Sequence, residues 1–330
     1  GSSAAPNRNL RRRDRIVIPS ARKRIGLESL PQKTPGRARI LPRMLVHVLG
    51  TAQDGGVPHP GCACPRCEAA QADPARARTA SSLAVQAGPG SMALLFDCAP
   101  EFPRQMALLQ QKVGPVPGRA LPIAGIFLTH AHVGHYLGLP FLGREAFSAR
   151  NLPVTCTPAM AAFLQDNRPF QHLARRGEIV LCPTLPGLPV DLQGLRVTAF
   201  HVQHRNEDAD TVGYRIEAGG KRVLFVPDFD VYDEKVLAEI RDSDLAFLDA
   251  TFYSEGELKG RDQKALGHVP VTESLDVLAD QAAKIRFLHL NHSNPALDPA
   301  SPERRELESR GFRVAEEGGT VVLAAATLAG

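Results

Sequence analysis

The sequence from Met44 onward predicts a mixed α/β (α+β) domain, a β-sandwich flanked by helices, on three observations. Strand-like segments outnumber helical ones early in the chain, helical segments fall between strands, and the order of strands followed by a helix occurs in both halves. A doubly wound nucleotide-binding fold would need a Gly-rich turn that joins the first strand directly to a helix. Residues 50–58 lead into prolines and cysteines instead, which favours the sandwich.

The individual elements follow from apolar runs and from the turn residues that bound them. A Gly/Pro/Cys-rich loop is expected from the end of the first strand to about Arg78, and Gly88-Pro89-Gly90 separates a strand pair. The predicted strands are Met44–Gly50, Ser81–Ala87, Met92–Cys98, Pro122–Thr129, Val154–Thr157, Leu195–Val202, Val212–Ala218, Arg222–Pro227, Leu245–Asp249, Ile285–Leu290 and Thr320–Ala325. The predicted helices are Phe102–Leu109, Pro158–Gln165, Glu234–Arg241, Thr272–Lys284 and Pro302–Ser309.

The positive charge of the chain belongs to its first 43 residues. This segment has twelve Lys or Arg against Asp14 and Glu28, a formal charge of +10; because the whole chain is +4, residues 44–330 carry −6. We therefore expect a basic, flexible extension before a single domain over residues 44–330. Such an arm can bind phosphates nonspecifically, and its Arg-rich, acid-poor composition is also typical of a transit peptide.

Composition excludes several classes of protein. No apolar run approaches the roughly 18 residues that a membrane helix needs, so no membrane span is expected. The acidic body and the scattered aromatic residues, without Trp, argue against a nucleic-acid-binding enzyme. We expect a cytoplasmic protein that acts on a small-molecule substrate, with organelle targeting and a homodimer left open.

Three histidines directly after an apolar strand predict a metal site. They lie in Thr129-His130-Ala131-His132-Val133-Gly134-His135, separated by small residues. Histidines at i and i+2 of an extended segment can converge on one cation, and a third at i+5 can reach a neighbouring one. Neutral imidazoles suit zinc, iron or manganese.

A cysteine cluster predicts a second metal site. Cys62-Ala63-Cys64-Pro65-Arg66-Cys67 places three thiols in one turn-rich loop, a spacing that favours a tetrahedral structural zinc with one further ligand. We assign that ligand to His292, with His59 as the alternative. The other cysteines, Cys98, Cys156 and Cys182, are expected to be small buried side chains in a chain kept reduced.

The histidine motif resembles the HxHxDH signature of metallo-β-lactamase-fold hydrolases. The resemblance implies a four-layer αββα sandwich with an active site for one or two ions of zinc, manganese or iron. It also implies that His204 completes the first metal position, that Asp228 bridges two metals, and that His289 completes the second position. His201 is the alternative to His204, which we prefer because His201 lies inside the predicted strand.

Gly134 departs from that signature, because it stands where the family has an aspartate ligand for the second metal. The second position then retains His135, His289 and Asp228 and can be weakly occupied, unless Asp54 in the first loop substitutes for the missing carboxylate. His268 resembles the histidine that serves family phosphodiesterases as general acid; a histidine at a helix start is the alternative interpretation.

Two longer segments resemble narrower groups of the same superfamily. VLGTAQDGGVPHPGCACPRC and FLHLNHSNPALDPASPERRELESRGF are similar to the pyrroloquinoline-quinone biosynthesis protein B (PqqB) group, over roughly residues 44–325. The cysteine triplet with a later His-x-x-His resembles the phosphoribosyl cyclic phosphodiesterase of phosphonate breakdown, where the second histidine completes a structural zinc site. That resemblance supports His292.

These resemblances imply two candidate reactions. The first is metal-assisted hydrolysis of a phosphodiester or other ester-like bond, with His268 protonating the leaving group. The second is iron-dependent oxidation or hydroxylation of a tyrosine-derived or other aromatic small molecule. His130 and His132 favour hydrolysis, whereas Gly134 favours a mononuclear redox centre.

Overall fold

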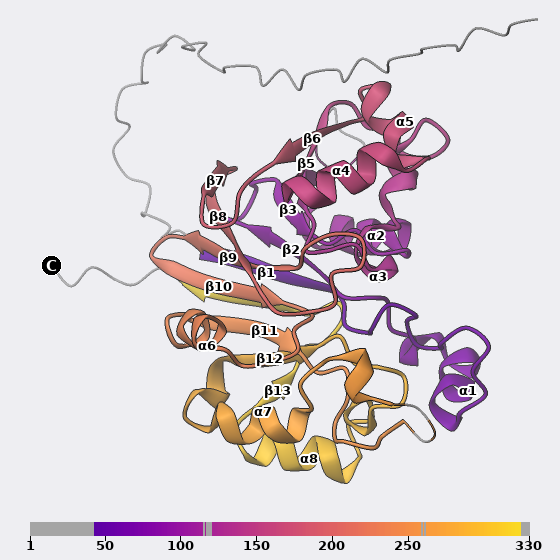
Figure 1. The fold of residues 1–330 in the computed structure, drawn as a ribbon, viewed down its shortest axis with the longest axis vertical. Helices are drawn as coiled ribbons and strands as arrows, with labels where there is room; N and C mark the ends of the chain where they lie inside the picture. Colours follow the sequence, from indigo (N-terminus) through magenta and orange to yellow (C-terminus); the bar gives the residue numbers. More distant parts are fainter. Residues whose placement is uncertain (1–42, 115, 117–120, 259, 261, 325–330) are drawn as a thin grey trace, which may run out of the picture. The chain divides into compact units, whose positions relative to one another are not determined.

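The structure is a computed structural model that describes residues 43–114, 116, 121–258, 260 and 262–324. Two seven-stranded mixed sheets form its centre (Figure 1). The first sheet has the order β14 (Thr320–Ala324), β1 (Arg43–Gly50), β2 (Ser82–Gln86), β3 (Ala93–Phe96), β4 (Ile123–Phe127), β5 (Leu152–Cys156) and β6 (Ile179–Pro183). The second has the order β13 (Arg313–Val314), β12 (Ile285–Leu288), β11 (Leu245–Asp249), β10 (Lys221–Val226), β9 (Val212–Ala218), β8 (Leu195–His201) and β7 (Pro189–Leu192).

Helices cover the outer faces of both sheets (Figure 1). On the first sheet lie α2 (Phe102–Val113), α3 (Val133–Tyr136), α4 (Pro158–Asp166) and α5 (Phe170–Arg175); on the second lie α6 (Glu234–Arg241), α7 (Val271–Val277) and α8 (Pro302–Ser309). A further helix, α1 (Pro65–Ala72), lies within the cysteine-rich segment, and 3₁₀ turns include η2 (Leu139–Leu142) and η4 (Ala279–Lys284). The four-layer αββα sandwich is therefore confirmed.

Alternation along the strands builds the layers. In β3, Leu94 and Phe96 face the core between the sheets, whereas Ala93 and Leu95 face the helices. This period of two is what a strand buried on both faces requires. Aromatic side chains from both sheets meet in the central core; Phe127, for example, has its ring centroid 5.6 Å from that of Tyr214.

Most predicted elements agree with the structure, and the differences have local causes. The predicted helix over residues 272–284 is wrong as one element, because α7 ends at Val277 and the 3₁₀ turn η4 follows. The predicted loop to Arg78 contains α1, whose first residue, Pro65, has its φ preset for a helix start. The strands β6 and β7 and the helix α5 were not predicted; the burial along β6 and β7 is incomplete, so their sequences lack a strong apolar pattern.

The predicted basic extension lies outside the described residues, apart from Arg43, which begins β1. Among the described residues, no helix is both long enough and apolar enough to cross a membrane.

Candidate metal centre

The carboxyl ends of parallel strands gather the polar residues of the site at one edge of the sandwich. The strands β10, β11 and β12 run parallel, as do β3, β4 and β5. The histidine motif follows β4, Asp228 follows β10, and His289 follows β12. The two sheets also join here, because the hydroxyl of Tyr214 donates to the carbonyl of Leu128, at 2.6 Å.

The first set of potential ligands combines His130, His132 and His204. One ring nitrogen from each lies within 4.8 Å of the others. Nε2 of His130 is 2.9 Å from Nδ1 of His132, and Nε2 of His204 is 3.8 Å from Oδ1 of Asp228. All four predicted residues of this position are thus brought together.

The second set combines Asp54, His135 and His289, again with ligand atoms within 4.8 Å of one another. Oδ2 of Asp228 lies 3.1 Å from Nε2 of His135 and 3.4 Å from Nε2 of His289. Oδ1 of Asp54 is 3.3 Å from Nε2 of His135. Asp228 therefore stands between the two sets, the place that the family pattern implies for a bridging carboxylate.

The position of Asp54 explains why residue 134 has no side chain. A Cβ atom built at Gly134 would lie 2.1 Å from Oδ1 of Asp54 and 2.7 Å from its Cα. The loop after β1 therefore occupies the space beside Gly134 and brings its own carboxylate to His135. The structure supports the hypothesis that Asp54 substitutes for the missing aspartate.

The atoms that face the centre have the properties of metal ligands. Among the described residues, five buried side-chain atoms at this site have no hydrogen-bond partner: Oδ1 of Asp54, Oδ2 of Asp228 and Nε2 of His135, His204 and His289. Buried polar atoms without partners are rare and require an explanation, and a bound cation provides one. The donor set of histidines and carboxylates fits zinc, manganese or iron.

Residues behind the histidines fix the direction of each ring. Nδ1 of His135 is 2.7 Å from Oδ2 of Asp97, and Nδ1 of His204 is 2.6 Å from Oδ1 of Asp230. Nδ1 of His289 is 2.9 Å from the hydroxyl of Thr251. Such contacts select the tautomer that points Nε2 at a metal.

His132 differs from these rings, because it presents Nδ1 rather than Nε2 to the centre. Its Nε2 is 3.3 Å from Oε2 of Glu207, which leaves Nδ1 toward His130. Nδ1 of His130 is 2.9 Å from the hydroxyl of Thr129. Sequence reasoning missed all of these orienting residues; Asp97, Asp230 and Thr251 come directly after buried strands or close to their ends, and that position was the available signal.

Burial and nearby charge favour the metal-binding protonation states of His130 and Asp228. Burial, followed by the proximity of His135, lowers the pKa of His130 well below its ordinary value. Burial alone would raise the pKa of Asp228, but His289, His135 and His130 together hold it well below the usual range. Neutral imidazole and ionised carboxylate are the forms that bind a divalent cation. For His135, burial alone would lower the pKa, but Asp97 and Asp228 raise it well above its ordinary value.

His268 lies beside this centre. Its Nδ1 is 2.7 Å from Oδ2 of Asp249 and 3.6 Å from Oδ1 of Asp228. Burial alone would lower the pKa of His268, but Asp249 outweighs it and raises the pKa to about 9. Its backbone has φ of 71°, which is uncommon outside glycine, and it precedes α7 without being the residue that caps it.

A pocket of about 630 Å³ opens next to His268. Its lining includes Thr251 and His268 as well as Cys62 and His292 of the cysteine site. The pocket therefore borders both predicted metal sites and provides room for a small molecule.

The structure brings the four predicted residues of the cysteine site together. One ligand atom from each of Cys62, Cys64, Cys67 and His292 lies within 4.8 Å of the others. Nδ1 of His292 is 3.5 Å from Sγ of Cys62 and 3.7 Å from Sγ of Cys64. All six cysteines are free thiols, so no disulfide competes for these sulfurs. Three thiols and an imidazole fit a tetrahedral zinc.

Two alternatives lie outside the clusters. The side chain of His201 is 55% exposed, and its Nδ1 lies 3.6 Å from Asp210 rather than in the metal centre. Nδ1 of His59 faces the carbonyl of Pro60 at 3.2 Å, and its ring packs against that of His292 at an angle of 39°. The prediction of three buried scattered cysteines is wrong for Cys182, which is only half-buried because it lies on the incompletely covered strand β6.

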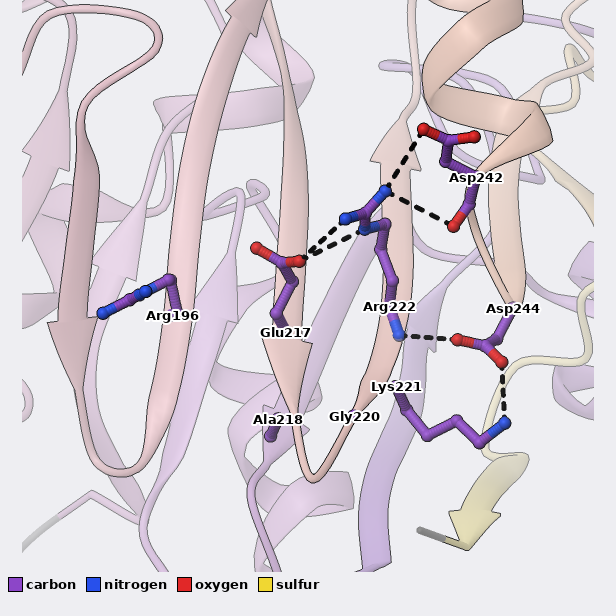
Figure 2. Close-up of a pocket in the computed structure, with 8 residues that line it drawn as sticks. All are labelled: Arg196, Glu217, Ala218, Gly220, Lys221, Arg222, Asp242 and Asp244. Carbon is purple, nitrogen blue, oxygen red and sulfur yellow. Dashed lines mark hydrogen bonds and ion pairs between the residues drawn. The ribbon is translucent and has the colours of Figure 1, made fainter. Parts of the chain in front are cut away.

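A second hollow, of about 550 Å³, lies at the opposite ends of the strands (Figure 2). Its charges neutralise one another: Arg222 contacts Glu217 at 3.1 Å, and Lys221 contacts Asp244 at 2.7 Å. Arg196 has no partner among the residues drawn in Figure 2, but Asp191 binds it at 2.8 Å. This hollow lacks the unpartnered ligand atoms of the metal centre.

Comparison with known proteins agrees with this geometry. Residues 93–292 match the family described as "Beta-lactamase superfamily domain". The chain belongs to the β-lactamase superfamily.

Within that superfamily, the chain is similar to the coenzyme PQQ synthesis protein B of Methylorubrum populi. The two are 35% identical over 309 residues, which cover 85% of this chain and all of the relative. The crystal structure of Zn²⁺-bound PqqB from Methylobacterium extorquens has a TM-score of 0.74 and 30% identity, covering 84% of this chain and 99% of that one. A diphosphatase of the PhnP family has a TM-score of 0.64 at 22% identity, covering 86% and 99%, and shares the fold.

Proposed function

We propose that this member of the superfamily is a metal-dependent hydrolase that cleaves a phosphodiester or other ester-like bond. The observation that carries the proposal is the pair of ligand sets that meet at Asp228, with Asp54 in the place beside Gly134. Divalent cations held there would lower the pKa of bound water and polarise the substrate oxygen. A second complete ligand set is what a hydrolytic centre with two ions needs.

The protein's own residues would position and protonate the substrate. Asp97, Asp230 and Thr251 hold three of the ligand rings in a fixed direction. Asp249 engages Nδ1 of His268, so Nε2 is the nitrogen that can give a proton to the leaving oxygen in the adjacent pocket. This arrangement supports His268 as the general acid. A positioning role is the alternative, and a variant of His268 distinguishes the two.

Iron-dependent oxidation of an aromatic small molecule is the second candidate, because the chain is 35% identical to a PQQ synthesis protein. Gly134 was the feature that favoured a mononuclear redox centre. Since Asp54 brings a carboxylate to that place, Gly134 no longer supports this candidate over hydrolysis.

The proposal is tested with bis(p-nitrophenyl) phosphate and protein loaded with zinc or manganese. The wild type is expected to release p-nitrophenol, and His132→Ala to lose this activity. His201→Ala is the matched control, because it removes a nearby histidine that lies outside both ligand sets. Turnover that survives in His132→Ala would refute the assignment of the site.

A further inference from the structure

The pocket beside His268 has one wall that suits an apolar group. Phe252, Leu258 and Leu266 line it, and the side chain of Phe252 is buried. Gln53 and Asn291 add amide groups to the same pocket. A small organic molecule, rather than an ion alone, fits such a lining.

Arg205 provides the pocket with a positive charge. It follows His204 directly, and among the described lining residues it is the one Arg or Lys. Its Nε is buried and has no hydrogen-bond partner in the part of the chain that the structure describes. The side chain as a whole is 37% exposed and lines the pocket, and its charge favours an anionic ligand, because carboxylates and phosphates match the planar donor geometry of arginine.

The nearby carboxylates leave this charge available. Glu207 lies 3.6 Å from Nη1 of Arg205, but its side chain is 57% exposed and its other oxygen faces His132. Exposed ion pairs of this kind contribute little. Both oxygens of Glu257 are engaged within the protein, one by the hydroxyl of Ser293 and the other by the backbone N–H of Tyr253, at 2.7 Å.

We infer that Arg205 binds a second anionic group of the substrate, a carboxylate or a phosphate separate from the bond that is cleaved. The substrate class is then a small organic acid whose ester meets the metal centre while its anion meets Arg205. That this ligand is a substrate rests on the proposed function, but the binding of the anion can be tested without turnover.

The test compares matched ligands on the zinc-loaded protein by isothermal titration calorimetry. Simple alkylphosphonates carry one group for the metal centre. The same compounds with a terminal carboxylate or a second phosphonate, on chains of two, three and four methylene groups, add an anion for Arg205. The wild type is expected to bind the best of the doubly charged ligands roughly ten- to a hundredfold more tightly than its parent, because hydrogen bonds to charged groups are strong.

Arg205→Gln should abolish this gain, Arg205→Lys should retain part of it, and zinc content should stay the same in both variants. Arg196→Gln is the matched control: it removes the same charge from the start of β8, where Arg196 pairs with Asp191. Arg196 lines the second hollow (Figure 2) and not the pocket beside His268. A gain that persists in Arg205→Gln, or that is absent at every chain length in the wild type, overturns the inference. Failure to cleave esters with the gain intact would instead count against the proposed function alone.

Discussion

A Cβ atom at Gly134 and Oδ1 of Asp54 would be 2.1 Å apart, so position 134 cannot carry the aspartate of the family signature while Asp54 lies beside it. We propose that the loop after β1, rather than the histidine motif, supplies the carboxylate of the second metal position. Its oxygen is buried without a partner and lies 3.3 Å from Nε2 of His135.

This relationship predicts the result of a reciprocal exchange. Asp54→Ala should lower the metal content by one ion per chain or weaken that ion roughly tenfold or more, since it removes a ligand. Adding Gly134→Asp to Asp54→Ala should not restore the ion, because the new Cβ atom would still lie 2.7 Å from the Cα atom of residue 54. Metal analysis after dialysis measures both effects, and unchanged metal content in Asp54→Ala would remove Asp54 from the ligand set.

His268 predicts a dependence on the leaving group. His268→Ala should slow the cleavage of alkyl esters by roughly a hundredfold or more, because their leaving oxygen needs a proton. Esters of p-nitrophenol should be much less affected, since that leaving group departs without protonation. Rate measurements over a series of leaving groups test this. An equal loss for every ester, at unchanged metal content, would indicate a positioning role.

The cysteine site predicts a loss of stability rather than of chemistry. Cys64→Ser should remove the structural ion and lower the melting temperature by roughly 5 °C or more, because such ions stabilise the fold directly. Cys182→Ser is the control, as Cys182 lies outside the cluster. Calorimetry and zinc analysis provide the readout. A well-folded Cys64→Ser protein that lacks active-site metal would contradict a purely structural role.

The buried carboxyl of Glu317, which belongs to neither ligand set, predicts that the stability of the folded protein changes with pH. Burial raises the pKa of this carboxyl to about 7, although the backbone N–H of Thr79 donates to it at 2.8 Å. Because the folded pKa lies above the ordinary 4.5, its favourable contribution is present below pH 4.5 and is lost as the pH rises through about 7.

Glu317→Gln should therefore stabilise the protein at pH 8, by up to roughly 3 kcal/mol, and much less at pH 5. Urea unfolding at the two values measures the difference between variant and wild type. A difference that does not depend on pH would show that the folded pKa of Glu317 is not raised.

The sequence predicted those parts of the site that lie in one local pattern. His130, His132 and His135 share a strand end, and Cys62, Cys64 and Cys67 share a loop, so spacing alone indicated metal binding. The remaining ligands depended on resemblance, because nothing local marks a single histidine such as His289. Asp54 remained a hypothesis until its contact with Gly134 was known, since these residues meet only in the folded chain.

The orienting residues and the pocket depended still more on tertiary structure. Asp97 is one aspartate after one buried strand, and its role appears only once His135 lies 2.7 Å away. Arg205 is an ordinary loop arginine in sequence, and only the folded pocket distinguishes it. Likewise, β6 and β7 lack a strong apolar pattern and are defined by the strands with which they pair.

Metal analysis of protein purified without oxygen, combined with two assays on the same sample, tests the central proposal most directly. We predict zinc or manganese at two ions per chain in the histidine and aspartate centre, with cleavage of bis(p-nitrophenyl) phosphate and no oxygen consumption. Iron at one ion per chain in that centre, with oxygen consumed in the presence of an aromatic substrate and no ester cleavage, would contradict it.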